Sequence, residues 1–307
     1  MRGKERQLVK TRPVIGLALG GGGARGYAHL GVLKALHQAN IPVAVIAGTS
    51  MGAIVGAAYA AGYPIDQLLE MALEINWRRL FSFFADITLP RQGVIAGNRL
   101  EEYFGTLTKG KTFDQLDVAL TVVATDIVTG EEVRLCSGPV AKAVRASIAI
   151  PGVFCPVKVG GRLLVDGSIA APVPTLAAFE AGATAVLAID VCSSVDRSDV
   201  LVQAWKWFKA VQARPTLQTV GIFDVLRSLK PGLPQCVSIV GRSLELCDRY
   251  PAIPPPLTSP VRYWQVRPAV DNVRWYEFHR AKECIHAGEA VGQQVAAEIR
   301  SLLDRGE

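Results

Sequence analysis

Short apolar runs alternate with helical patterns through the first two thirds of the chain. The runs at 14–20 (VIGLALG), 43–49 (VAVIAGT) and 185–191 (AVLAIDV) are apolar almost throughout, as strands buried on both faces of a parallel sheet are. Between the first two, residues 27–40 repeat apolar side chains at helical spacing, and the small residues of 51–63 favour a helix packed closely on a sheet. This alternation predicts an α/β fold.

The middle of the chain adds two hairpins and three helices. The first hairpin joins VALTVVATDIV to EEVRLC through Thr-Gly, and the second is VKVGGRLLVDG. Helices are expected at 64–75, at 140–149 ahead of Pro151, and at 172–183. After residue 195 the pattern weakens to helical stretches near 200–213 and 236–249, a Pro-rich loop, a strand VRYWQVRP and a long helix from about 275.

Composition narrows the class of protein. Half of the 307 residues are hydrophobic, which excludes a disordered chain, and no apolar run reaches the roughly 18 residues of a membrane-spanning helix. The basic start followed by VIGLALG mimics a short signal peptide, but the run leads into four glycines, so we expect a strand. No Cys-x-x-Cys pair occurs, and we expect reduced thiols in a soluble, cytoplasmic protein. The six cysteines are at 136, 155, 192, 236, 247 and 284.

The net charge of +6 is compatible with either nucleic acid or an anionic membrane as a binding partner. Basic residues are spread along the chain without a nucleic-acid-binding motif, so we expect no nucleic acid. An anionic membrane surface satisfies the charge equally well.

The segment GTSMG places Ser50 between Gly48 and Gly52, after a predicted strand and before a predicted helix. Gly-x-Ser-x-Gly in this context is the pattern of a nucleophile elbow, in which a sharp turn exposes the hydroxyl. Upstream, GGGARG (21–26) lies between a strand and a helix and formally matches the dinucleotide-binding fingerprint. That fingerprint requires a carboxylate near the end of the second strand, where this chain has Ser50. A P-loop is also not indicated, because its Gly-Lys-Ser/Thr ending is missing. Backbone N–H groups of such a loop also suit the oxyanion of an acyl-transfer intermediate.

Histidines are one source of a base for Ser50. The order Ser50, Asp166, His279 is that of an α/β-hydrolase triad, although that fold places its histidine on a loop and its elbow after several strands. The other three histidines also lie in predicted helices: His29 and His37 after the Gly-rich loop, and His286 with His279 near the C-terminus. Glu283 shares a helical face with the last two, which permits a metal, but the His-Glu-x-x-His motif is absent.

A carboxylate is the other source. Asp166 ends an apolar strand in LLVDGS, where burial would raise its pKa and make it a stronger base. The ordinary alternative is a turn residue, as in most Asp-Gly pairs.

Five sequence segments occur in an order and spacing that can be compared with known families: GGGGARGYAHLGVLKAL, GTSMGAIVGAAYAAG, ATDIVTGE, ASIAIPGVFCPV and VDGS. Over about residues 14–192 the chain resembles the patatin-like phospholipase family, in its bacterial branch related to neuropathy target esterase. The resemblance implies a three-layer α/β/α fold with a mainly parallel central sheet. With the weaker pattern after residue 195, we expect a basic tail (1–13), a patatin-like catalytic domain (14–195) and a mainly helical extension packed on that core (196–307).

The same resemblance implies a Ser50–Asp166 dyad, with no histidine, metal or cofactor. The oxyanion hole would be lined by Gly21, Gly22, Gly23 and Arg25, and the remaining motif glycines are Gly26, Gly48, Gly52 and Gly167. One departure is Ser168, since the family reads Asp-Gly followed by Gly or Ala.

The implied substrates are lipid esters of the phospholipid or lysophospholipid type. Residues 76–90 and 205–214 mix aromatic and basic side chains in the manner of membrane-interface segments, so peripheral contact with an anionic membrane is a further expectation. Burial of these aromatic residues in the core is the competing interpretation. A regulatory protein that keeps the fold without turnover, and a thioesterase or small-ester hydrolase, remain open alternatives.

Overall fold

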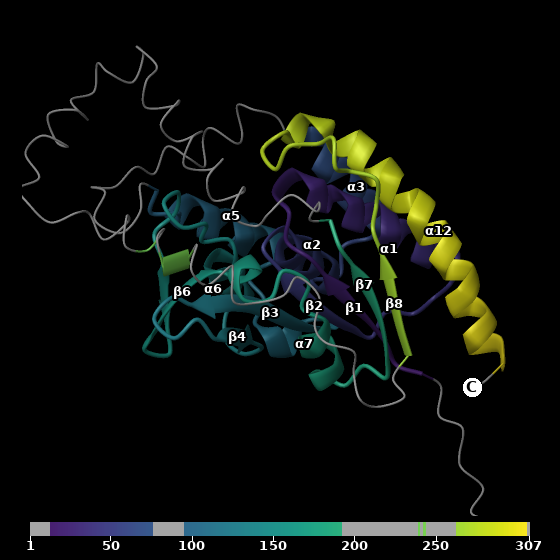
Figure 1. Ribbon diagram of the computed structural model, residues 1–307, viewed down its shortest axis with the longest axis horizontal. Helices are drawn as coiled ribbons and strands as arrows, with labels where there is room; N and C mark the ends of the chain where they lie inside the picture. The colour runs from purple at the N-terminus through teal and green to yellow at the C-terminus, as the bar shows by residue number, and fades with distance from the viewer. Residues whose placement is uncertain (1–12, 76–94, 192–238, 240–241, 244–261, 306–307) are drawn as a thin grey trace, which may run out of the picture.

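The computed structural model describes residues 13–75, 95–191, 239, 242–243 and 262–305 (Figure 1). The strands are β1 (Ile15–Leu19), β2 (Val45–Thr49), β3 (Ala119–Asp126), β4 (Glu132–Leu135), β5 (Val157–Val159), β6 (Arg162–Asp166), β7 (Ala185–Ile189) and β8 (Arg262–Val266). The α-helices are α1 (Ala28–Gln38), α2 (Met51–Ala60), α3 (Ile65–Glu74), α5 (Asn98–Leu107), α6 (Val140–Ser147), α7 (Thr175–Glu180) and α12 (Ala281–Arg305). Short 3₁₀ helices are η1 (Gly23–Tyr27), η2 (Phe113–Gln115), η3 (Gly167–Ile169) and η4 (Phe278–Arg280).

One mixed sheet holds all eight strands. Their order is β5-β6-β3-β2-β1-β7-β8, and β4 also pairs with β3. The central pairs from β3 to β8 are parallel, whereas β4, β5 and β6 pair in antiparallel fashion. The expected α/β class with a mainly parallel centre is confirmed, and both predicted hairpins form.

Strand β3 has three neighbours on two edges. Val122 pairs with residues of both β2 and β4, and Ala124 pairs with residues of both β4 and β6. β4 therefore occupies one edge of β3, while β2 and then β6 share the other. Because β6 runs antiparallel to β3, the carboxyl ends of β2 and β6 meet on that shared edge.

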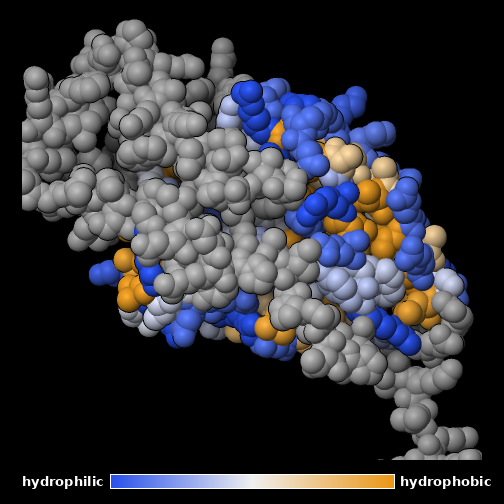
Figure 2. All heavy atoms as spheres, viewed as in Figure 1, coloured by the Kyte–Doolittle hydropathy of each residue, from blue (hydrophilic) through white to orange (hydrophobic). Residues whose placement is uncertain are grey.

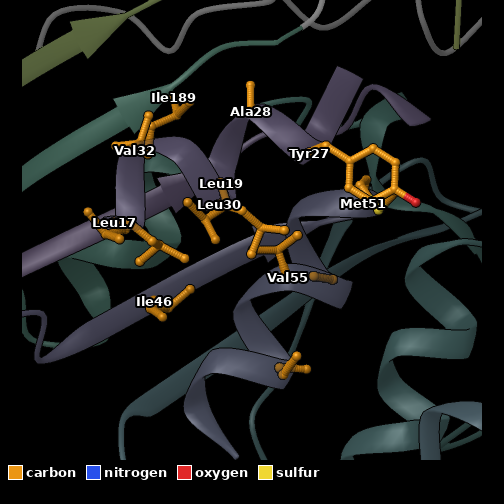
Figure 3. Packing of buried hydrophobic residues seen from close by; sticks show 14 of the residues in the cluster. Leu17, Leu19, Tyr27, Ala28, Leu30, Val32, Ile46, Met51, Val55 and Ile189 are labelled. Carbon is orange, nitrogen blue, oxygen red and sulfur yellow. The ribbon is translucent and has the colours of Figure 1, made fainter. Parts of the chain in front are cut away.

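Helices cover the two faces of the sheet. Leu17 and Leu19 of β1 and Ile46 of β2 face α1 and α2 in the larger core cluster, where Figure 3 places them beside Leu30 and Val55. Alternate residues such as Ala18 and Ala47 face α7 in a second, smaller cluster. This alternation follows from the two-residue period of strands, and it produces the three layers seen in Figure 1.

The C-terminal part of the chain is built into this architecture. β8 extends the sheet as the parallel neighbour of β7, and α12 runs along α1 on the outside of the molecule (Figure 1). Glycines allow the close approach of the two helices: a methyl group at Gly288 would collide with the Ala28 carbonyl. The long helix begins at residue 281, later than expected, because residues 278–280 form η4.

The described surface carries scattered hydrophobic residues. Its exposed large hydrophobic side chains come from α3, the turn after β3, α7 and β8: Leu73, Val128, Leu176 and Tyr263. Figure 2 shows hydrophobic spheres interspersed with hydrophilic ones. Within the described ranges, no helix combines the length and the hydropathy needed to cross a bilayer. The segments 76–90 and 205–214, the helical stretch near 200–213 and three of the cysteines lie outside the residues that the structure describes. So do nearly all of the 1–13 tail and of the stretch 236–249, in which residues 239 and 242–243 are described and helical.

Candidate active site

Ser50 stands at the sharp turn between β2 and α2. Its backbone has φ 51° and ψ −118°, a left-handed region that is costly for a residue with a side chain. Gly52 makes the turn sterically possible, since a methyl group there would collide with the Leu19 carbonyl of β1. The side chain is buried apart from 8% of its surface. The strained backbone, the flanking glycines and the position at the carboxyl edge are the features of a nucleophile elbow.

Asp166 ends β6 and faces Ser50. The Ser50 hydroxyl donates a hydrogen bond of 2.8 Å to Oδ2 of Asp166, and the Ser168 amide donates one of 2.8 Å to Oδ1. Burial raises the pKa of the Asp166 carboxyl above its ordinary value, and the hydrogen bonds from Ser168 and Ser50 oppose that rise. The result is a carboxylate of increased proton affinity in direct contact with a serine hydroxyl.

The sheet explains why two residues so distant in sequence meet. Thr49, the residue before Ser50, pairs with Val123, and Asp166 pairs with Ala124, the next residue of β3. Thr49 and Asp166 therefore lie next to each other along the same edge of β3. Gly167 completes the approach, since a methyl group there would collide with the Val123 carbonyl.

The Gly-rich loop lies against this pair. A methyl group at Gly21 would come within 3.3 Å of the Ser50 Cβ and would collide with the Ser168 hydroxyl. The Gly21 amide donates to Pro172 O at 2.9 Å, and the Arg25 amide donates to Gly22 O at 3.3 Å. Among the described residues, no acceptor is found for the amides of Gly22 and Gly23.

Two further residues of the loop motif serve packing. The Arg25 side chain is buried, and its Nε donates to the Val273 carbonyl at 2.6 Å. Gly26 lies on Met51, with which a methyl group would collide. Ser168, the departure from the family pattern, fits the space between Asp166 and Gly21.

The histidines are arranged differently from a triad. His279 lies in η4 and not in the long helix, and His37, His279 and His286 are exposed. His29 is fully buried, and its Nε2 donates to Gly20 O at 2.8 Å. Burial lowers the pKa of His29 to about 4, so its ring is neutral at pH 7. The groups that contact the Asp166 carboxylate in the described part of the chain are Ser50 and Ser168.

An apolar cavity opens onto Ser50. Its volume is about 190 Å³. Residues of α2, α3 and α5 line it, together with residues of the segments 148–154 and 275–278. Tyr27 and Met51, neighbours in Figure 3, line it close to the loop and the elbow. Such a lining binds hydrocarbon and excludes water. The described part of the chain contains no cluster of His, Cys, Asp or Glu that could hold a metal ion.

Sequence reasoning missed the residues that support the site. Ser147 accepts a hydrogen bond of 2.8 Å from the Ser50 amide, and the Trp275 carbonyl accepts one of 2.7 Å from the Ala24 amide in the Gly-rich loop. Ser147 stands in a block that the sequence analysis singled out, but nothing in its neighbours indicates which backbone group it meets. Trp275 lies more than 200 residues from the loop, and no sequence pattern indicates that it contacts it.

Together these features define an α/β protein with a serine elbow and a buried carboxylate at the carboxyl edge of its sheet. The model of the patatin-like phospholipase family matches residues 17–179, and the chain belongs to that family.

Several relatives are similar to this chain. An uncharacterised NTE family protein of Mycobacterium tuberculosis is 40% identical over 164 residues, which are 53% of this chain and 45% of that protein. A lysophospholipase of Emericella nidulans is 27% identical over 94% of this chain and 18% of its own length. The chain thus spans less than half of the curated relatives it matches. Among solved structures, VipD from Legionella pneumophila gives a TM-score of 0.46 at 14% identity, over 94% of this chain and 67% of that one.

Proposed function

We propose that the protein is a serine acyl hydrolase that cleaves lipid esters with a Ser50–Asp166 dyad. The observation that carries the proposal is the 2.8 Å hydrogen bond from the Ser50 hydroxyl to a buried carboxylate, at the mouth of an apolar cavity. The shape and lining of the cavity suit an acyl chain. Family membership and the lysophospholipase named among the relatives support a phospholipid or lysophospholipid as the ester.

The reaction would proceed in two halves. Ser50 Oγ attacks the ester carbonyl while its proton passes to Asp166, and the tetrahedral intermediate collapses when Asp166 returns that proton to the leaving alcohol. Water then enters, gives a proton to Asp166 and attacks the acyl-Ser50 carbonyl. The fatty acid leaves as Asp166 reprotonates Ser50 Oγ. One base thus serves both halves, and atoms balance as ester plus water giving acid plus alcohol.

The developing oxyanion needs donors. We assign this role to the amides of Gly22 and Gly23, which have no acceptor among the described residues, with the Arg25 amide beside them because its bond to Gly22 O is long at 3.3 Å. We leave Gly21 out of the proposed hole, since its amide is used by Pro172.

The decisive test is covalent labelling of the whole chain with a fluorophosphonate probe, read by intact mass. Wild type should gain one adduct, and Ser50→Ala should gain none. Asp166→Asn, which keeps the shape and removes the basicity, should slow both labelling and ester hydrolysis nearly as far as Ser50→Ala. His279→Ala should stay within a few-fold of wild type.

The possible outcomes separate the alternatives. If folded wild type takes no adduct, the protein is a regulatory member of the fold and the proposal fails. If His279→Ala abolishes labelling with unchanged circular dichroism, a triad replaces the dyad. A panel of thioesters, short esters and lysophospholipids of increasing chain length, with Ser50→Ala as the blank, then identifies the preferred ester.

We further propose that the protein meets its substrate at an anionic membrane surface, because the proposed lipid-ester substrates reside in membranes and the net charge of +6 favours anionic lipid. Vesicle flotation should recover more protein with anionic than with zwitterionic vesicles, and the difference should shrink in high salt. Equal recovery with both kinds of vesicle would contradict it.

A further inference from the structure

The end of α6 contacts the backbone of both dyad residues. Ser147, the last residue of the helix, accepts the Ser50 amide through its hydroxyl, and two residues later the Ala149 carbonyl accepts the Asp166 amide at 3.0 Å. Segment Ser147–Ile150 therefore touches the nucleophile on one side and the base on the other.

Ser147 also takes the place of an inter-strand hydrogen bond between β2 and β3. The β2–β3 ladder ends at the pair Thr49–Val123, because Ser50 leaves the strand with its left-handed φ. At that point the Ser147 hydroxyl bridges the gap: it accepts from Ser50 N at 2.8 Å and donates to Val123 O at 2.6 Å. Ser147 is fully buried, so no water can take over these two bonds without a rearrangement.

The same segment lines the acyl cavity. Ile148 and Ile150 face the cavity, while the alternate positions Ser147 and Ala149 contact the dyad. The strain at Ser50 needs such a support, because a left-handed non-glycine residue persists only where its surroundings hold it.

We propose that Ser147 is a positioning residue that fixes the Ser50 elbow at hydrogen-bonding distance from Asp166. The inference rests on the proposed function of Ser50. It adds that nucleophile geometry depends on a hydroxyl from another helix, in the segment that also bears the acyl chain. Ser147 touches neither the Asp166 carboxylate nor the reacting oxygen, so it acts through the Ser50 backbone.

The test compares Ser147→Ala with wild type in the full chain. Removing the hydroxyl leaves the buried Ser50 amide without an acceptor, and the misplaced nucleophile should lower kcat and the fluorophosphonate labelling rate by roughly 10- to 100-fold. KM should change less than threefold, because the cavity is intact. The acid limb of the pH–rate profile should stay where it is, because Asp166 keeps its partners. Ser147→Thr, which restores a hydroxyl, should recover most of the labelling rate.

Thr108→Val is the matched control. Thr108 is equally buried, and its hydroxyl donates to the Phe104 carbonyl at 2.7 Å in a bond that does not involve the dyad. It should cost stability but leave kcat within twofold. If Ser147→Ala labels as fast as wild type, or if Thr108→Val slows labelling as much, the inference is overturned. Failure of wild type to label at all would instead overturn the proposed function. Should Ser147→Ala be unfolded by circular dichroism, Ser147→Cys takes its place, and wild-type labelling by that weak hydrogen-bonding side chain would equally overturn the inference.

Discussion

Asp166 must be ionised to accept a proton, and its burial works against ionisation. Because burial raises the pKa of this carboxyl, we expect kcat/KM to fall on the acid side at a pH above the ordinary aspartate value of about 3.9. The amide and the hydroxyl of Ser168 both oppose the rise of the Asp166 pKa by donating to the charged carboxylate. Ser168→Ala keeps the backbone amide and loses the hydroxyl, so its acid limb should move to higher pH. A pH–rate profile of both proteins checks this, and a limb that moves to lower pH would contradict it.

We expect His29 to affect stability and not turnover. Its pKa is lowered to about 4 in the folded chain, against an ordinary value near 6.5 in the unfolded chain. The unfolded state therefore binds more protons between these two pH values. Stability is full above about pH 6.5 and falls by about 3 kcal/mol as the pH drops toward 4.

Urea unfolding of wild type and His29→Gln at pH 7 and pH 4.5 isolates this contribution. The glutamine amide can donate to the Gly20 carbonyl and does not titrate in this range. Wild type should lose more stability than His29→Gln on going to pH 4.5. Equal losses would show that another group titrates.

Much of the site was predictable at the scale of single residues. Ser50, Asp166 and the Gly-rich loop stand in local patterns, because an elbow needs glycines beside it and a base needs a strand end. The contact between them follows from register on β3, where β6 takes the edge that β2 leaves. No local pattern encodes this arrangement of β2 and β6 on β3. The hydrogen bonds of Ser147 and Trp275 likewise join residues far apart in sequence, so no local pattern indicates them.

At the scale of elements, the segment between β8 and α12 holds the Gly-rich loop. Val273 O accepts from the Arg25 guanidinium, Trp275 O accepts from the Ala24 amide, and Gly23 lies so close to Trp275 that a methyl group would collide with its carbonyl. This segment lies beyond residues 17–179, which match the family model. The structure around the proposed oxyanion hole is thus completed by a part of the chain that the family pattern does not cover.

Arg25→Met should loosen that loop. The variant keeps a long apolar stem and loses the buried hydrogen bond to Val273, so we expect kcat to fall about tenfold, with the probe still reacting only at Ser50. Arg300→Met is the control, because Arg300 also donates to a distant backbone carbonyl, that of Ala39, but lies on the outer helix. Steady-state kinetics of the two variants measure the difference in kcat. An equal fall in kcat in both variants would show that the Arg25 hydrogen bond has no particular effect on the loop.

At the scale of the whole molecule, the described C-terminal elements β8 and α12 are part of the main fold. The sequence predicted a mainly helical extension packed on the core, and its described part does place α12 on α1. It also contributes β8 to the central sheet, a strand that the sequence indicated without its partner. Pairing between strands distant in sequence depends on side chains of the whole sheet, so a single run such as RYWQV reveals that it is a strand but not where it pairs.

The register of β3 has a consequence for the time at which activity appears. Ser50 and Asp166 are 116 residues apart, so during synthesis the proposed nucleophile emerges long before the proposed base. A one-residue slip of β6 would turn Asp166 to the opposite face of the sheet. On the proposed mechanism, we therefore expect Ser50 of a partly folded chain to be inert. During refolding from urea, fluorophosphonate labelling should follow hydrogen-exchange protection of β3 and β6 and never precede it. Labelling of chains whose β6 amides still exchange freely would mean that the nucleophile needs no completed sheet.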